Sequence, residues 1–307
     1  MIKVAVIAGS AGATDKLNDY DVTGGNIQYY DIYDNKLKGN RILWMIRNMA
    51  MFIINIRKFD ALLLIYVCKA HYIYAYIAKV FGVPTIAHWI GTDVYKLLHS
   101  KRKYPGLHKY TIHLACSNEL QEELATKGVS AKVLIIEPGH ISIDIAKMPE
   151  LHAVCIYMPN GRELFYGYDI LSKVINKYPQ VDFYIVANNN SDLFPQPNAK
   201  MLGWISREEM DSLYNKISIV IRCVAHDGWS QIVTEGLFKG KEIIYNFSKI
   251  PYTRKAATFE QICKEMDDIL LNPPTPCRDA HEYALKNHKP QMYSERMANE
   301  IRELLNV

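Results

Sequence analysis

The sequence predicts an α/β protein built from two Rossmann-like, doubly wound domains. Short, continuous apolar runs alternate with helix-like segments, and this alternation stops near the middle of the chain and then starts again. Apolar runs without polar alternation are typical of parallel strands that are buried on both faces. The chain has 307 residues, about twice the length of a typical domain, so it has room for two such units.

The first half of the chain contains five apolar runs and three helix-like segments. The apolar runs are 4–8, 61–67, 85–90, 112–116 and 133–136. The helix-like segments are 40–58, 71–81 and 118–127. Ser117 caps the last of them and Gly128 follows it, which is the usual order of helix start and stop signals. This alternation predicts a parallel sheet covered by helices.

The second half repeats the pattern after a pause at 137–151, where two prolines and a glycine interrupt it. Its apolar runs are 153–158, 181–187, 199–202, 217–222 and 242–245. After Pro251 the sequence predicts helices only. We therefore place an N-terminal domain at 1–145 and a C-terminal domain at 150–292.

Composition narrows the class of function. The chain is 49% hydrophobic and 22% charged, which is ordinary for a globular protein. Its net charge of +4 suits anionic small molecules, phosphates or acidic lipid surfaces, and it lacks the clustered basic stripe of a nucleic-acid binder. The six cysteines form no CxxC or CxxH pair, so we expect neither a zinc site nor disulfides. We expect the protein to reside in a reducing cytosol. We expect neither a signal peptide nor a membrane-spanning segment.

The clearest motif begins at Asp227, just after the apolar run that ends at Arg222, and reads DGWSQIVTEGLFKGKEII. A loop that opens a helix offers unpaired backbone N–H groups and a partial positive charge, which suits a pyrophosphate. Gly228 lets the backbone approach such a ligand closely. Glu235 lies roughly two turns further on, on nearly the same face as Asp227. The alternative is an amphipathic helix with two exposed acids.

This segment resembles the EGFGxxxxEAxxxGxPVI signature of retaining GT-B glycosyltransferases of family 4, and it keeps the register of both acids and of Gly240. The resemblance implies that Glu235 accepts hydrogen bonds from the ribose of a nucleotide-sugar donor and that Asp227 contacts the transferred sugar. Asp227 is one carbon shorter than the family's Glu, so the sugar is left open. The residues implied at this part of the donor site are Asp227, Gly228, Trp229, Ser230 and Glu235.

Two further segments resemble the family's donor site. Arg162 matches the arginine of the GR…KG segment, which neutralises the diphosphate, although it can equally be a solvated loop arginine. Tyr166 stands where the family has Lys, so either its hydroxyl donates instead, or a basic residue comes from elsewhere, or diphosphate stabilisation is impaired. Gly203 and Trp204 match a turn beside the nucleotide base, and Ser206 caps the next helix in any case.

The first half carries weaker resemblances. Gly9 and Gly12 follow the first apolar run, as in the glycine loop of GT-B enzymes, without completing the GxGxxG of an NAD site. The stretch HWIGTDV at 88–94 resembles the family's h.HGtDv, with Ile90 in place of the catalytic His. We therefore consider His88 as its catalytic substitute. Thr92 and Asp93 are either acceptor-side residues or helix caps. A formal DxD at 19–21 follows no apolar strand, so we expect no metal site.

The segment 41–58 has a mixed helical stripe. Its members are Arg41, Trp44, Asn48, Met51, Asn55 and Lys58. We expect a second set of residues to pack inward, and these are Ile42, Met45, Ile46, Met49, Phe52, Ile53 and Ile56. A stripe that combines Trp and Met with Arg and Lys suits a lipid headgroup boundary. The alternative is an ordinary solvated helix face.

The resemblance implies a two-domain GT-B enzyme whose domains face an interdomain cleft, with a final helix at 293–307 crossing back onto the first domain. Such an enzyme moves a sugar from a UDP-, GDP- or similar nucleotide sugar to an acceptor hydroxyl, with retention, without metal or other cofactor. We expect hexosyl transfer in glycan, glycolipid or polysaccharide assembly, with a glycan or lipid-linked acceptor and no nucleic acid. The expected location is cytoplasmic, at the inner face of the cell membrane.

Two alternatives stay open beside transfer. Because Ile90 and Tyr166 depart from the family pattern, the chain can be a degenerate, non-catalytic GT-B protein that binds nucleotide or glycan. An NAD-dependent dehydrogenase would need a complete first-loop fingerprint and an acid at the end of the second strand, and neither is clear.

Overall fold

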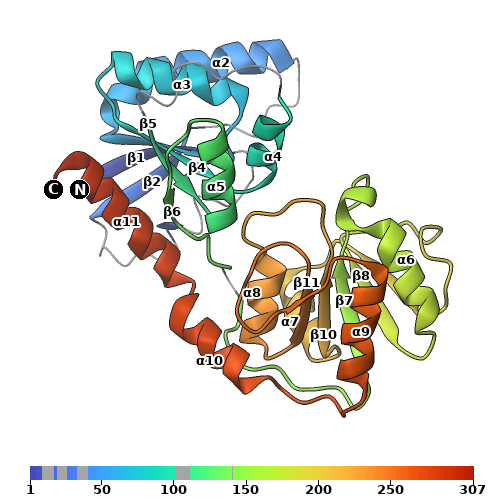
Figure 1. Ribbon diagram of the computed structural model, residues 1–307. Coiled ribbons are helices and arrows are strands. Elements are labelled where there is room, and N and C mark those ends of the chain that lie inside the picture. Colours follow the sequence, from blue (N-terminus) through green and yellow to red (C-terminus); the bar gives the residue numbers. More distant parts are fainter. Residues whose placement is uncertain (9–16, 19–25, 33–40, 101–110, 140) are drawn as a thin grey trace. The chain divides into compact units, whose positions relative to one another are not determined.

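The computed structural model describes residues 1–8, 17–18, 26–32, 41–100, 111–139 and 141–307. The chain divides into two compact units (Figure 1). The first is Met1–Glu137 together with Pro290–Val307, and the second is Pro138–Lys289. In the described part of the chain each unit has one six-stranded sheet, parallel throughout, with helices packed on it. The predicted fold class, two doubly wound α/β domains, is confirmed.

The sheet of the first unit has the strand order β2-β1-β3-β4-β5-β6. Its strands are β1 (Ile2–Ala8), β2 (Ile27–Asp31), β3 (Ala61–Ile65), β4 (Thr85–Trp89), β5 (Thr111–Ala115) and β6 (Lys132–Val133). Its helices are α2 (Arg41–Asn55), the 3-10 turn η1 (Ile56–Lys58), α3 (Lys69–Val80), α4 (Thr92–Leu98) and α5 (Asn118–Thr126). All residues of β3 and β4 are buried, as expected of central parallel strands.

Strand β2 was not predicted, because its side chains alternate between buried and exposed at the edge of the sheet. Such a strand has no continuous apolar run.

The C-terminal helix α11 (Gln291–Leu305) belongs to the first unit. Tyr293, Met297 and Ile301 recur every four residues and are buried in the same core as β1, β3 and β4. The Ser294 hydroxyl donates a hydrogen bond of 3.1 Å to the Leu17 carbonyl. The last residues of the chain therefore complete the core that the first residues begin.

The sheet of the second unit has the strand order β12-β11-β10-β7-β8-β9. Its strands are β7 (Ala153–Tyr157), β8 (Asp182–Val186), β9 (Ala199–Gly203), β10 (Ile219–Arg222), β11 (Glu242–Tyr245) and β12 (Arg254–Lys255). Its helices are the 3-10 turn η3 (Leu164–Tyr166), α6 (Tyr168–Lys177), α7 (Arg207–Tyr214), α8 (Gln231–Phe238), α9 (Phe259–Leu270) and α10 (Arg278–Asn287). The short β12 corrects the expectation of helices only after Pro251.

The boundary between the units falls at Pro138, earlier than the 145–150 expected from the sequence. The segment after Pro138 packs on the second unit. Ile141 and Ile143 contact its core, and the backbone N–H of Lys147 donates to Asn215 Oδ1 at 3.0 Å. The second crossing falls at 289/290 rather than 292/293.

Helix α2 differs from the expected arrangement of its faces. Asn48, expected on the exposed stripe, is buried, whereas Ile46 and Ile53, expected to pack inward, are exposed. Phe52 and Ile56 are buried as expected and Met51 is exposed as expected. The side chain of Trp44 lies outside the described residues. The error arose because both faces of the helix are apolar, so hydrophobicity did not indicate which face packs on the sheet.

Candidate functional site

The second unit contains a cavity of about 420 Å³ at the carboxyl ends of its parallel strands. Tyr157, Val186 and Arg222 enter it from the ends of β7, β8 and β10. The other lining residues are Trp204, Ile205, Ser206, Arg207, Met210, Asp227, Trp229, Ser230, Gln231, Ile232 and Glu235. This edge of an open parallel sheet is where α/β proteins bind ligands. We call this cavity the donor pocket, after the nucleotide-sugar donor that the sequence resemblance predicts for it.

The N-terminus of α8 forms one wall of the donor pocket. Ser230 is the N-cap residue, and its side chain does not cap the helix. Among the described residues, the buried Ser230 hydroxyl and the buried Trp229 indole N–H find no hydrogen-bond partner. The first turn of a helix adds backbone N–H groups without intrahelical partners and a partial positive charge. This wall is therefore rich in donors that suit an anionic, oxygen-rich ligand.

Helix α8 approaches the sheet closely because of Gly236. A Cβ atom at this position would lie 2.5 Å from Ile243 Cδ1 and 3.3 Å from Val220 Cγ2. The small residue that follows the second acid of the motif therefore has a packing role. It positions the helix that carries Glu235.

Glu235 is oriented from the neighbouring helix. The hydroxyl of Tyr214, the last residue of α7, donates a hydrogen bond of 2.8 Å to Glu235 Oε2. Burial, and then the charge of Glu235, raises the pKa of Tyr214 well above its usual value, so the hydroxyl stays a donor. The Glu235 carboxylate is thereby fixed at the wall of the donor pocket.

Asp227 forms a buried ion pair with Arg222. Arg222 donates to Oδ2 from Nε at 2.9 Å and from Nη2 at 2.8 Å, and the Tyr245 hydroxyl donates to the same oxygen at 3.2 Å. Within the described residues, Oδ1 accepts one further hydrogen bond, 3.1 Å long, from the backbone N–H of Gly228. The two side chains are 8% and 13% exposed. Asp227 therefore fixes the loop and Arg222 together, and Oδ1 keeps capacity for a ligand hydroxyl.

The ring of Tyr166 contacts the guanidinium groups of both Arg162 and Arg222. The Arg222 guanidinium carbon is 4.8 Å from the centroid of the Tyr166 ring, and that of Arg162 is 5.3 Å from it. Arg162 also lies over Phe165 at 4.5 Å, outside the lining of the donor pocket. Of the alternatives left open at Tyr166, the structure favours a basic residue from elsewhere, because Arg222 lines the pocket.

Gly203 shapes the turn that presents Trp204. Its φ of +66° is left-handed, a conformation that favours glycine, and its backbone N–H donates to the Asn188 carbonyl at 2.9 Å. The Trp204 ring is 72% exposed and meets the Tyr157 ring edge-on at 6.2 Å. This pair forms an aromatic border of the donor pocket.

The expected site residues of the first half lie in the first unit. His88 is fully buried, with Nε2 2.8 Å from the Leu134 carbonyl and Nδ1 3.3 Å from the Tyr293 hydroxyl. Because a carbonyl only accepts, Nε2 carries the proton and Nδ1 accepts from Tyr293. Burial lowers the pKa of His88 to about 4. His88 therefore lies inside the first unit, and its expected catalytic role stays a prediction.

Asp93 is also internal. Its carboxylate accepts hydrogen bonds from the backbone N–H groups of Val67, Ile90, Gly91 and Val94 at 2.8 to 3.2 Å. Burial raises the pKa of Asp93, and these hydrogen bonds oppose the shift. Asp93 thus ties the ends of β3 and β4 to the start of α4. Thr92, half-buried, is the first residue of that helix.

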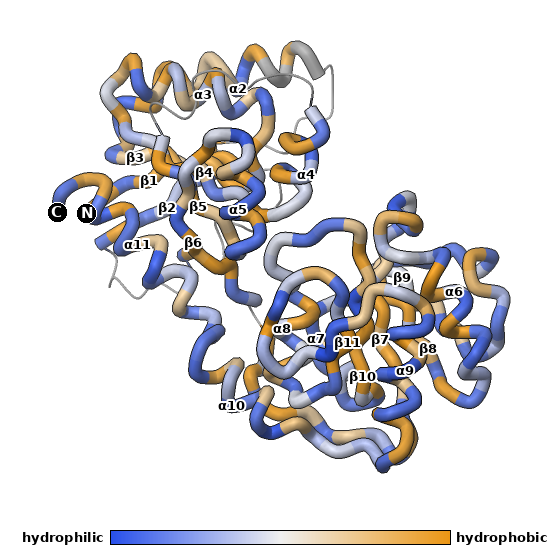
Figure 2. The backbone as a smooth tube through the Cα atoms, viewed as in Figure 1, coloured by the Kyte–Doolittle hydropathy of each residue, from blue (hydrophilic) through white to orange (hydrophobic). Residues whose placement is uncertain are grey.

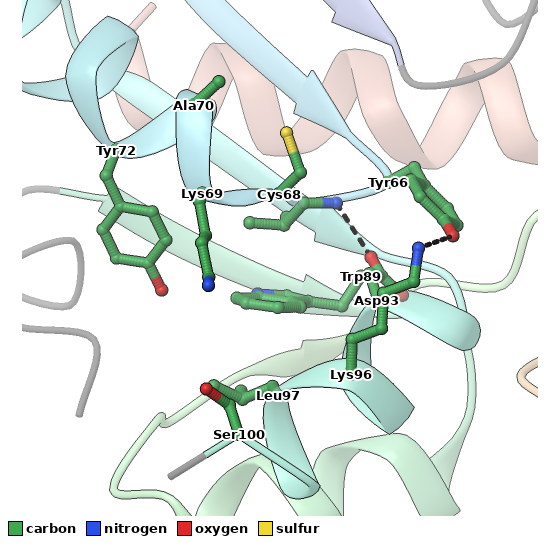
Figure 3. Close-up of a pocket in the computed structure, with 11 residues that line it drawn as sticks. Tyr66, Cys68, Lys69, Ala70, Tyr72, Trp89, Asp93, Lys96, Leu97 and Ser100 are labelled. Carbon is green, nitrogen blue, oxygen red and sulfur yellow. Dashed lines mark hydrogen bonds between the residues drawn. The ribbon is translucent and has the colours of Figure 1, made fainter. Parts of the chain in front are cut away.

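A second cavity, of about 550 Å³, lies beside Asp93 at the carboxyl ends of β3 and β4 (Figure 3). Trp89 lines it and donates from its indole N–H to His113 Nδ1 at 3.0 Å. Lys96 Nζ donates to the Tyr66 hydroxyl at 3.0 Å, and Lys69 lies on the same wall as Cys68 (Figure 3). This first-unit cavity thus combines two ammonium groups with aromatic rings.

The structure brings five of the expected residues into the donor pocket: Trp204, Asp227, Trp229, Ser230 and Glu235. Arg162, Tyr166, Gly203 and Gly228 lie beside it through the contacts given above. Gly9, Gly12 and the DxD at 19–21 fall outside the described residues.

Sequence reasoning missed several residues that shape the donor pocket, among them Arg207, Tyr214 and Tyr245. Their positions follow no motif. The only available signal was their placement at strand and helix ends.

The described residues offer neither a metal-binding cluster nor a membrane-spanning helix. Over the described residues, no group of three or more His, Cys, Asp or Glu side chains gathers in a geometry that could hold a metal ion. Over the same residues, no helix combines the length and apolarity needed to cross a bilayer.

Two Rossmann-like units, one with a donor-rich pocket at its strand ends, define a GT-B fold. The similar solved structures include a sucrose-phosphate synthase from Thermosynechococcus elongatus, with 10% identity, a TM-score of 0.73 and 100% of both chains covered. The lipopolysaccharide outer core galactosyltransferase WaaB has 13% identity, a TM-score of 0.68 and coverage of 98% of this chain and 99% of its own. The predicted GT-B fold is confirmed.

The same fold also occurs in a structure from Listeria monocytogenes described as a UDP-N-acetylglucosamine 2-epimerase, with 10% identity, a TM-score of 0.58 and coverage of 99% and 97%. No family model matches the sequence. No curated protein matches it either.

Proposed function

We propose that this protein is a glycosyltransferase that takes its sugar from a nucleotide diphosphate sugar held in the donor pocket. The observation that carries the proposal is the convergence of the α8 N-terminus, Arg222 and Glu235 on one cavity at the strand ends. Each group matches a different part of such a donor. The similar solved structures include a galactosyltransferase, a sucrose-phosphate synthase and a UDP-N-acetylglucosamine 2-epimerase.

The diphosphate is assigned to the α8 wall. The helix N-terminus, the Ser230 hydroxyl and the Trp229 indole N–H supply neutral donors, and Arg222 supplies a fixed cation. These donors are held before the ligand arrives, so they need no reorganisation as negative charge develops on the leaving diphosphate. In this proposal they take the place of a divalent ion.

Glu235 is assigned to the ribose and the Trp204 border to the base. A carboxylate fixed by Tyr214 suits the two ribose hydroxyls, which need acceptors. The aromatic pair Tyr157 and Trp204 suits a flat nucleobase. Asp227 Oδ1 is assigned to a hydroxyl of the sugar. Retention of configuration and hexosyl transfer rest on the resemblance of the 227–244 segment to family 4.

The acceptor is assigned to the first-unit cavity. Tyr66 and Tyr72, both half-buried, offer rings of the kind on which sugars pack, and Lys69 and Lys96 offer charge to a phosphate. Asp93 shapes this cavity through the backbone. We propose a glycan or lipid-linked acceptor of the cytoplasmic face, used in glycan, glycolipid or polysaccharide assembly.

The test is direct measurement with purified protein. Thermal-shift screening against UDP- and GDP-sugars should show stabilisation by at least one of them, because a bound donor stabilises by mass action. The stabilising donor is then incubated with the protein and a pool of glycan and lipid-linked acceptors. Release of nucleoside diphosphate coupled to a glycosylated product supports transfer.

Three other results would contradict transfer. Stabilisation without turnover favours the degenerate binding protein. A changed configuration of the sugar, with the nucleotide still attached, favours an epimerase. Absence of any stabilisation by nucleotides overturns the donor pocket itself.

A further inference from the structure

Helix α2 turns apolar side chains toward solvent. Leu43, Ile46 and Ile54 are 66%, 61% and 69% exposed. At about 3.6 residues per turn, positions 43, 47, 50 and 54 share one stripe, on which Arg47 is the charged residue. The opposite side of the helix is buried through Phe52. A helix that is apolar on both sides is normally covered by protein or by lipid.

Helix α3 carries a similar exposed apolar stripe. The Phe52 ring of α2 meets the Tyr74 ring of α3 edge-on at 4.8 Å, so the two helices pack against each other. Ile73, Tyr76 and Val80 of α3 are 54%, 62% and 64% exposed at spacings of three and four. Figure 2 shows hydrophobic residues along both helices. We call these two exposed stripes together the α2–α3 face: Leu43, Ile46, Ile54, Ile73, Tyr76 and Val80.

The charges of the segment 41–92, which carries both helices, are almost all positive. Between positions 41 and 92 the basic residues are Arg41, Arg47, Arg57, Lys58, Lys69 and Lys79. The acid in this stretch is Asp60, whose Oδ2 accepts the backbone N–H of Lys3 at 2.7 Å. Arg47, Lys58 and Lys79 are exposed. Exposed aliphatic groups bordered by basic groups match the boundary between acyl chains and anionic headgroups.

We propose that the α2–α3 face docks on the surface of a bilayer that contains anionic lipids. The aliphatic side chains enter the headgroup boundary, and Arg47, Lys58 and Lys79 contact lipid phosphates. The same positive charge disfavours a second copy as the occupant, because an isologous dimer would bring like charges together. The surface also differs from the stripe expected from the sequence, since Ile46 and Ile54 replace Asn48 and Asn55 at its centre.

Vesicle co-sedimentation of the full chain tests this inference. Binding is measured with phosphatidylcholine vesicles and with vesicles that also contain phosphatidylglycerol, at low and high salt. The variants are Ile46→Glu and Ile54→Glu, each at an exposed site where the fold does not depend on the side chain. Leu271→Glu is the matched control, because Leu271 is 80% exposed in the second unit.

We expect binding that needs phosphatidylglycerol and weakens with salt. Each α2 variant should lower the partition coefficient about tenfold or more, since one buried aliphatic side chain is lost and a charge is added. Leu271→Glu should bind like the wild type. The three variants should have the same melting temperature as the wild type.

Three results would overturn the inference. The first is absence of binding to anionic vesicles. The second is equal loss of binding in the α2 variants and the control. The third is a dimer in sedimentation velocity that Ile54→Glu dissociates while vesicle binding stays absent. The inference does not depend on the proposed donor pocket, so donor binding can fail while vesicle binding holds.

Discussion

At the scale of single residues, the two acids of the donor pocket are held in different ways. Glu235 receives a hydrogen bond from Tyr214 of another helix, whereas Asp227 shares a buried ion pair with Arg222. Charged hydrogen bonds of this kind are stronger than neutral ones. The same arrangement leads to two different expectations, one for ligand affinity and one for stability.

Glu235→Ala should weaken binding of a nucleotide-sugar donor about 10- to 100-fold, because charged hydrogen bonds to the ligand are lost. Tyr214→Phe removes the hydroxyl that holds Oε2 and should have a smaller effect. Glu208→Ala, at an exposed position on α7, is the control. Calorimetric titration with the best donor from the thermal-shift screen gives the affinities, and near-normal affinity of Glu235→Ala would refute the assigned ribose contact.

Asp227→Asn should destabilise the second unit by about 3 kcal/mol, because it leaves the buried Arg222 charge without its partner. Urea unfolding followed by circular dichroism measures this difference. Adding Arg222→Met should recover part of the loss, since no unpaired charge then remains buried. A single variant as stable as the wild type would show that the pair does not hold the loop.

At the scale of elements, β4 and α11 are joined through His88 and Tyr293. This contact links residues 205 positions apart in the chain. It makes the first unit sensitive to pH, because a neutral His88 is required at its centre.

The contribution of His88 to the stability of the first unit should be lost as the pH falls from 6.5 toward 4. The folded pKa of His88 lies at about 4 and the unfolded value at 6.5, so the unfolded chain binds a proton over this range that the folded chain does not. This difference amounts to about 3 kcal/mol. The pKa of buried His71 is likewise lowered to about 4 by burial.

Urea unfolding at several pH values between 7 and 4 tests this expectation. His88→Gln should make the pH dependence clearly shallower than in the wild type, since the His71 contribution remains. An unchanged slope would mean that His88 takes up its proton without leaving the core.

At the scale of the whole molecule, each unit has its own sheet and its own hydrophobic core. The second unit is continuous in sequence, whereas the first needs α11 from the far end of the chain. The two units should therefore differ in whether one continuous fragment of the chain folds alone.

A fragment comprising residues 138–289 should fold alone and bind the nucleotide-sugar donor, because it contains every residue of the donor pocket. A fragment comprising residues 1–137 should not form a stable fold, since loss of α11 exposes the side of its core that Tyr293, Met297 and Ile301 cover. Circular dichroism melting of both fragments, with donor added to the first, measures this. A cooperative transition in the fragment 1–137 would contradict the role given to α11.

The sequence predicted the fold class and the donor-site motif because both depend on local patterns. Buried parallel strands appear as continuous apolar runs, as in β3 and β4. The stretch 219–238 carries the strand β10, the loop and the helix α8 in direct succession. The residues Tyr214 and Tyr245 could not be predicted, since only the fold brings their hydroxyls to Glu235 and Asp227.

The sequence alone therefore determined two doubly wound α/β domains and the loop at Asp227 that opens a helix. The tertiary structure alone decided which side of α2 is exposed, that His88 lies inside the first unit, and that the boundary falls at Pro138. The physical reason is that periodicity records whether a residue is apolar, while burial depends on what packs against it. In α2 both sides are apolar, so only packing distinguishes them.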